Sequence, residues 1–195
     1  REKSDMRKIL YIFLASAVAL LSSCVKEDGL AGHDAGAAAA MNMKLKMDCD
    51  YFTPTDDGLI PTGELRPVEG TPMDFRTPHA IADSINSDYY QVKNATGYDH
   101  NWCLNTYKDG KGDDTQVCAS LYSPTTGIFM EMYTNEPGVQ VYTANFQGVG
   151  RDAEIRRKHG VKYPKHVSVC LESQKYPDSP NKPEWVQPTL KPGEK

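Results

Sequence analysis

The sequence predicts an all-β domain, and three observations support this fold class. The 195 residues include thirteen prolines, fifteen glycines and eleven tyrosines, a composition typical of strands joined by many turns. Few stretches show the apolar period of a long amphipathic helix. Several segments instead alternate apolar and polar residues, which is the pattern of a strand with one buried face. With 39% hydrophobic residues, the chain has enough apolar material for one core.

Charge and metal-ligand spacing exclude two kinds of function. The net charge is −4 at pH 7, so the basic surface that nucleic-acid binding needs is not expected. No CxxC motif is present and the histidines are scattered along the chain, so no metal site is predicted.

Residues 1–24 have the pattern of a secretory signal peptide. A basic start around Arg7 and Lys8 precedes an apolar run at residues 9–21, which is too short to span a bilayer comfortably. The run ends in residues 21–24 (LSSC), which resemble a bacterial lipobox. This resemblance implies export, cleavage before Cys24 and lipidation of Cys24, so that acyl chains would hold the protein at the bacterial cell envelope. The alternative is an ordinary secretory signal in which Cys24 is incidental.

Residues 25–40 are predicted to be a linker, because residues 29–40 (GLAGHDAGAAAA) are small and featureless. The globular domain is then expected at residues 41–195. Four cysteines remain in it, and they are compatible either with two disulfides in one of three connectivities or with buried free thiols. These are Cys49, Cys103, Cys118 and Cys170.

The first half of this domain combines strands with one long loop. Residues 41–48 alternate cleanly and predict a half-buried strand. Residues 51–75 contain four prolines and predict an ordered loop that wraps the sheet. A hairpin turn is expected at residues 108–114, and a strand pair at residues 116–122 and 127–134.

The strand predicted at residues 166–172 supplies the first candidate site residue, Glu172. Val167, Val169 and Leu171 fall on one face of this strand, and Glu172 falls on the opposite face, just before a turn at residues 177–183. A carboxylate on a rigid strand is well placed to act as a general base. The alternative is a solvated glutamate on an exposed face.

Two further polar residues lie in segments that allow more than one interpretation. Asp99 lies in residues 97–101 (GYDHN), where polar side chains stand beside an aromatic ring, as they do in sugar sites. A loop held by side-chain hydrogen bonds is the alternative. Gln140 stands between Val139 and Val141 and points away from their face, which is also compatible with a merely exposed side chain.

Several segments together resemble the aldose 1-epimerases (galactose mutarotases), and the resemblance extends over residues 30–194. It implies a large antiparallel β-sandwich of the galactose mutarotase-like (supersandwich) type, of which this chain would hold roughly the C-terminal half. The segments are residues 52–56 (FTPTD), 59–64 (LIPTGE), 70–76 (GTPMDFR), 97–101 (GYDHN), 136–145 (EPGVQVYTAN), 170–174 (CLESQ), 176–181 (YPDSPN) and 190–194 (LKPGE).

The resemblance implies an isomerase that interconverts the α and β anomers of free hexoses such as galactose and glucose. This chemistry opens the sugar ring by acid–base catalysis and needs no cofactor. In the family pattern Glu172 is the base, while Asp99 and Gln140 bind sugar hydroxyls. This resemblance is the main ground for singling out Glu172, because the strand pattern alone favours a solvated glutamate.

The chain departs from the family at the acid. The family places a catalytic His in a motif whose tail alone is present, as residues 30–33 (LAGH). In register, Val25 takes the position of that acid, and His33 is not that residue. The departure implies poor turnover unless a partner supplies the acid, and uncovered sheet edges that a partner or a second copy could cover. A non-catalytic carbohydrate-binding lipoprotein and a truncated gene product are the alternative interpretations.

Overall fold

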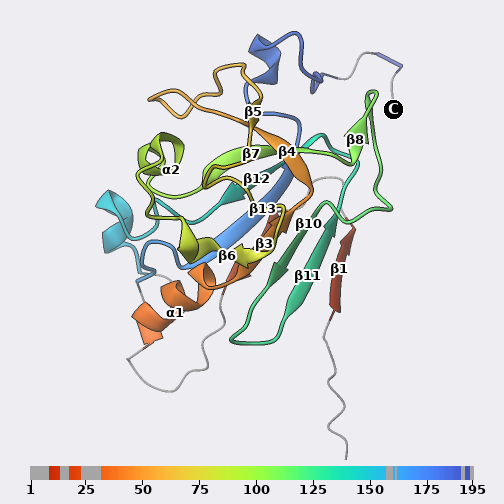
Figure 1. Ribbon diagram of the computed structural model, residues 1–195. Helices are drawn as coiled ribbons and strands as arrows, with labels where there is room; N and C mark the ends of the chain where they lie inside the picture. Colours follow the sequence, from red (N-terminus) through yellow and green to blue (C-terminus); the bar gives the residue numbers. More distant parts are fainter. Residues whose placement is uncertain are drawn as a thin grey trace, which may run out of the picture.

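Two β-sheets form the body of the molecule, as Figure 1 shows for the computed structural model. The structure describes residues 9–13, 18–22, 32–156, 160, 162–189 and 192–193. Within them the strands pair antiparallel except for β1 with β11, which pair parallel. The expected all-β, mainly antiparallel architecture is therefore confirmed.

Among the described residues, each sheet has a simple strand order. The five-stranded sheet runs β1 (Ile9–Phe13), β11 (Phe129–Tyr133), β10 (Ala119–Tyr122), β3 (Lys44–Met47) and β6 (His79–Ala80). The six-stranded sheet runs β2 (Val18–Ser22), β13 (Ser168–Gln174), β12 (Gly138–Tyr142), β7 (Asp99–Leu104), β4 (Cys49–Thr53) and β5 (Arg66–Pro67). A separate hairpin joins β8 (Tyr107–Lys108) to β9 (Lys111–Gly112).

The helices are short. They are α1 (Gly32–Met41), α2 (Tyr90–Asn94) and the 3₁₀ turns η1 (Ile81–Asp83), η2 (Gly150–Glu154) and η4 (Ser179–Asn181). No helix among the described residues is long and apolar enough to span a membrane.

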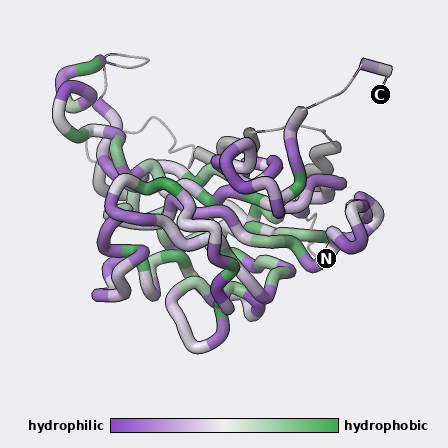
Figure 2. Tube along the Cα trace, turned by 90° about the horizontal axis from the view of Figure 1, so that it is seen from above, coloured by the Kyte–Doolittle hydropathy of each residue, from purple (hydrophilic) through white to green (hydrophobic). Residues whose placement is uncertain are grey.

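One hydrophobic core lies between the sheets, because alternate residues of each strand point toward it. Leu45 and Leu121 enter it from the five-stranded sheet, and Trp102, Val141 and Leu171 enter it from the six-stranded sheet. Figure 2 shows hydrophobic stretches passing through the middle of the molecule, with hydrophilic chain around the outside.

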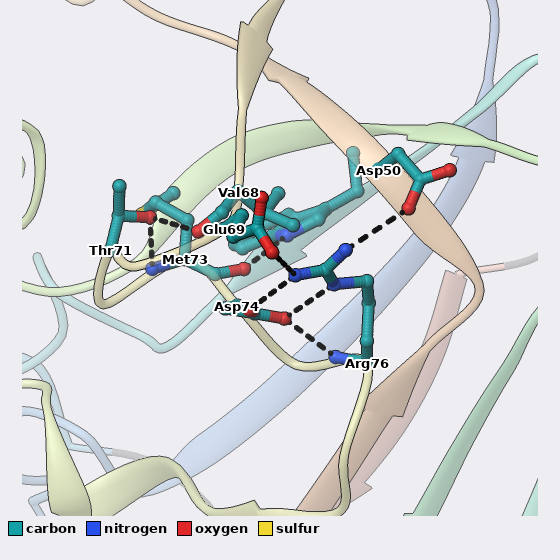
Figure 3. Close-up of polar contacts among 8 residues, drawn as sticks. Asp50, Val68, Glu69, Thr71, Met73, Asp74 and Arg76 are labelled. Atoms are coloured by element: carbon teal, nitrogen blue, oxygen red, sulfur yellow. Dashed lines mark hydrogen bonds and ion pairs between the residues drawn. The ribbon is translucent and has the colours of Figure 1, made fainter.

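The predicted proline-rich loop at residues 51–75 is ordered. It begins in the second half of β4 and contains β5, and these two strands pair antiparallel. The end of this loop lies in the core, where Met73 and Phe75 are fully buried. The Met73 carbonyl accepts a hydrogen bond from Trp102 Nε1 at 2.9 Å. Arg76 fastens this end to β4, since its guanidinium contacts Asp74 Oδ2 at 2.8 Å and Asp50 Oδ1 at 3.3 Å (Figure 3).

The predicted hairpin and strand pair are confirmed. Asp109 and Gly110 both have positive φ, 52° and 77°, which is the conformation of a two-residue hairpin turn between β8 and β9. β10 and β11 pair antiparallel around the turn that follows Tyr122.

The N-terminal region differs from the expectation in one respect. Residues 32–41 of the predicted linker and strand form the helix α1, and the strand β3 begins only at Lys44. Alanine is the strongest helix former, so the run at residues 37–40 favours helix rather than a flexible linker. β1 and β2 fall inside the predicted signal peptide, which stays a prediction. Cys24 and Val25 lie outside the described residues.

The four cysteines of the domain are free and buried, which agrees with the thiol alternative. Burial raises the pKa of Cys103 to about 11 and that of Cys118 to about 12, so both remain protonated at neutral pH.

Candidate functional site

Three neighbouring strands of the six-stranded sheet bring the three candidate residues together (Figure 1). β12 lies between β7 and β13, and both pairings are antiparallel. In this register Gln140 stands opposite Asn101 on one side and opposite Glu172 on the other. Residues that are far apart in the sequence therefore form one row across the sheet.

These side chains share the face of the sheet that is turned away from the core, which we call the outer face. Alternation settles this point, because Trp102, Val141 and Leu171 fill the core and their chain neighbours must point the other way. Glu172 and Gln140 are half-buried there, so both remain accessible. The predicted orientations of Glu172 and Gln140 are thus confirmed.

A chain of hydrogen bonds connects the polar groups of the outer face. Gln140 Nε2 donates to Asp99 Oδ1 at 2.8 Å, and Gln140 Oε1 accepts from Gln174 Nε2 at 3.2 Å. Gln174 Nε2 also donates to Asn101 Oδ1 at 3.4 Å. The structure therefore joins Asp99 and Gln140 directly.

Both carboxylates of the outer face have raised pKa values. Burial raises the pKa of Glu172, and the negative charge of Asp99 raises it further. Burial also raises the pKa of Asp99, while the hydrogen bond from Gln140 opposes that rise. A carboxylate whose pKa is raised is a stronger base in its ionised form, as a proton-accepting catalyst requires.

Gly138 allows this face to pack closely. A Cβ atom at position 138 would lie 2.3 Å from Asn101 Oδ1 and 3.0 Å from Tyr176 Cδ1, both shorter than normal contacts. Glycine therefore lets the Asn101 side chain lie flat over β12.

The sequence analysis did not single out Asn101, Gln174 or Tyr142, although all three lie on the outer face. Tyr142 stands opposite Asp99 and Cys170, and its ring stacks on Phe146 with centroids 6.3 Å apart and planes 25° apart. Strand alternation already places Gln174 with Glu172 and Tyr142 with Gln140, so the pattern contained a signal for them. The signal for Asn101 was weaker, because β7 begins with three successive polar residues, Asp99, His100 and Asn101, which hide the alternation.

No described histidine side chain forms a hydrogen bond or ion pair with Glu172. His79 lies in the five-stranded sheet and packs on Phe75, and His166 Nδ1 lies 2.8 Å from the Thr143 carbonyl oxygen. His100 is 1% exposed, and burial lowers its pKa to about 4, so it is neutral at pH 7. His33 lies in α1.

Surface hollows elsewhere in the described part of the chain include the following three. The first is lined by residues including Asp57 and Arg66, the second by residues including Thr106 and Gln116, and the third by Lys175 and its neighbours. None of them includes Glu172, Asp99 or Gln140. The candidate site is therefore distinct from these three hollows.

The fold and the outer face define a class: a β-sandwich protein that places two carboxylates and several amides on one sheet face. The family model described as aldose 1-epimerase matches residues 32–195. A galactose mutarotase from Mus musculus is 39% identical over 159 residues, and an aldose 1-epimerase from Escherichia coli (strain K12) is 38% identical over 157 residues. The chain belongs to the aldose 1-epimerase family.

Solved structures have the same fold. A GalM/aldose epimerase homologue from C. elegans superposes with a TM-score of 0.65 at 23% identity, covering 81% of this chain and 44% of that one. A galactose 1-epimerase from Lactobacillus acidophilus NCFM gives a TM-score of 0.55 at 27% identity, covering 71% of this chain and 36% of that one.

The matched segment covers most of this chain but less than half of each relative. The mouse and E. coli relatives match 82% and 78% of this chain respectively, but only 42% of their own length in each case. The chain thus spans about two fifths of the length of these relatives.

Proposed function

We propose that this chain is the Glu172-bearing part of an aldose 1-epimerase that interconverts the α and β anomers of free hexoses such as galactose and glucose. The observation that carries the proposal is the strand register, which sets Glu172 opposite Gln140 while Gln140 donates to Asp99. Relatives that are similar over this segment are described as galactose mutarotases and aldose 1-epimerases, which supports the same chemistry.

In the proposed reaction Glu172 takes the proton of the anomeric hydroxyl. An acid gives a proton to the ring oxygen, the bond between this oxygen and the anomeric carbon breaks, and an open-chain aldehyde forms. Rotation of the aldehyde and reclosure on its other face give the other anomer. Asp99 and Gln140 hold the remaining hydroxyls, so that the sugar stays oriented through the ring-opened stage.

The acid has no assigned residue in this proposal. By the family pattern its position falls at Val25, and none of the described histidine side chains forms a hydrogen bond or ion pair with Glu172. One member of an acid–base pair contributes roughly 10²–10⁴-fold in rate. Slow turnover by this chain alone therefore follows, unless a partner or a second copy supplies the acid.

This gap favours a second candidate, a non-catalytic carbohydrate-binding protein that uses the same outer face. Under either function the predicted lipobox supports a proposal that the protein is exported and anchored at the bacterial cell envelope through Cys24. Mass spectrometry of the membrane fraction for an acylated N-terminal Cys24 would test the anchor, and a soluble protein that retains residues 1–23 would contradict it.

Polarimetry tests the catalytic proposal directly. The decay of optical rotation of freshly dissolved α-galactose is followed with the purified protein, with Glu172→Gln and with the control Glu131→Gln, which removes a strand carboxylate of the five-stranded sheet. Acceleration by the wild type and the control, lost in Glu172→Gln, is the expected result.

Absence of acceleration in all three proteins would contradict turnover by this chain. Saturable galactose binding in that case would support the second candidate, and no binding would overturn both.

A further inference from the structure

Gln140 can donate a hydrogen bond to Asp99 only if the NH₂ group of its amide points toward Asp99. Neighbouring amides on the outer face set this orientation. An ionised carboxylate accepts hydrogen bonds but cannot donate them. The atom of Gln140 that faces Asp99 Oδ1, 2.8 Å away, must therefore be Nε2. Gln140 Oε1 then points the opposite way, toward Gln174.

Donors and acceptors are matched in the same way between Gln140, Gln174 and Asn101. An oxygen on Gln140 requires a donor on Gln174, and Gln174 Nε2 supplies it at 3.2 Å. The second hydrogen of that NH₂ group is directed to Asn101 Oδ1 at 3.4 Å. Each amide thus has one orientation that avoids placing two donors or two acceptors face to face.

Asn101 shows that this orientation has a cost. Its side chain is buried, at 1% exposure, and among the described residues its Nδ2 group has no hydrogen-bond partner. Turning the amide round would point Nδ2 at the NH₂ group of Gln174, so two donors would meet. Gly138 leaves the space that the side chain needs. A buried donor without a partner is unfavourable, so its presence calls for a compensating role.

We propose that Gln174 and Asn101 are positioning residues, which hold the Gln140 amide with its NH₂ group toward Asp99 and leave Asp99 Oδ2 available to a sugar hydroxyl. Among the described residues, Asp99 Oδ2 has no hydrogen-bond partner from the protein. The inference rests on the proposed function for the identity of the ligand, but the orientation of the amides can be measured without sugar.

The hydrogen bond from Gln140 opposes the effect of burial on the pKa of Asp99. Without Gln174 the Gln140 side chain regains rotamer freedom and donates to Asp99 for less of the time. The carboxylate of Asp99 then loses part of its stabilisation, and its pKa rises.

The experiment compares Gln174→Met with the control Gln116→Met. Both substitutions remove an amide without adding charge, but Gln116 is exposed and donates to Asp113 Oδ2 at 2.6 Å in another part of the molecule. Carboxyl carbons of ¹³C-labelled protein are titrated by NMR. We expect the pKa of Asp99 to rise in Gln174→Met and to stay unchanged in Gln116→Met, where that of Asp113 rises instead.

A second readout is galactose affinity, which should weaken by about fivefold in Gln174→Met, as expected for one ordinary hydrogen bond. Asn101→Ala should move the Asp99 pKa in the same direction, and Gln174→Met decides alone if that variant does not fold. An unchanged Asp99 pKa in folded Gln174→Met would overturn the inference. Failure of the wild type to bind galactose, with the Asp99 shift present, would instead count against the proposed function.

Discussion

The two faces of the six-stranded sheet are built from the same strands, but one face packs in the core and the other carries the polar candidate site. Toward the core, Trp102, Val141 and Leu171 are each fully buried. One residue earlier or later along the same strands, Asn101, Gln140 and Glu172 form a polar row on the outer face. A shift of a single residue in register would exchange the two sets, so core packing is what fixes the position of the candidate site.

The largest effect is expected on the core face. Trp102→Ala should lower the free energy of unfolding by about 3–5 kcal/mol, because it leaves a cavity and removes the hydrogen bond to the Met73 carbonyl. Urea denaturation measures this loss, with Gln140→Ala on the outer face as the comparison. Equal losses from the two substitutions would show that the faces are not energetically distinct.

The next effect concerns pH. His100 is on the core face, and burial lowers its pKa from about 6.5 to about 4. Its neutral form therefore contributes stability that is present above pH 6.5 and is lost as the pH falls toward 4, by up to about 3 kcal/mol at the rate of 1.4 kcal/mol per unit. His100→Leu should flatten the stability curve over this window. If the unfolding free energies of the wild type and the variant changed with pH in parallel, the lowered pKa of His100 would be refuted.

Gly138→Ala tests the packing of the outer face. The new Cβ would lie 2.3 Å from Asn101 Oδ1, so the Asn101 side chain would have to move. Overpacking of this kind lowers the free energy of unfolding by about 1–3 kcal/mol. Thermal unfolding measures the loss. Gly110→Ala cannot serve as a neutral control because φ is 77° there, whereas Ser120→Ala changes a strand residue outside the site. A stable Gly138→Ala protein with unchanged Asn101 signals would disprove the close approach.

Glu172→Gln should have the smallest effect on stability, and of the opposite sign. The pKa of Glu172 is raised on folding, so the folded protein binds this proton more tightly than the unfolded chain does. Stability is therefore lost as the pH rises through the unfolded and then the folded pKa of the group. The variant lacks this loss, and it should equal or exceed the wild type in unfolding free energy at pH 7. A variant that is less stable at pH 7 but not at pH 4 would contradict this sign.

The sequence predicted the outer face better than the N-terminal region, for a physical reason. Alternation along residues 166–172 and around Gln140 depends only on the twofold period of a strand, so the orientations of Glu172 and Gln140 could be predicted. That the two stand opposite each other depends on which strands pair, and no local pattern contains that information. The hydrogen bonds among Asn101, Gln174 and Gln140 depend on this pairing as well.

The helix α1 differs from the predicted linker because small residues are not all flexible. Glycine and alanine are both small, but alanine favours helix, and the buried Ala40 and Met41 anchor the end of α1 in the core. That residues 1–24 form a signal peptide stays a prediction about processing, and the strand pairing of β1 and β2 does not test it.

The central claim is that the outer face binds a hexose and the core face does not. Its most direct test is a galactose titration of ¹⁵N-labelled protein that follows the side-chain amides of Gln140 and Gln174, the indole N–H of Trp102 and the exposed amide of Gln116. Saturable shifts at Gln140 and Gln174, with Trp102 and Gln116 unmoved, are the predicted result. Galactose that moves none of these signals, or moves Gln116 as much as Gln140, would contradict the claim.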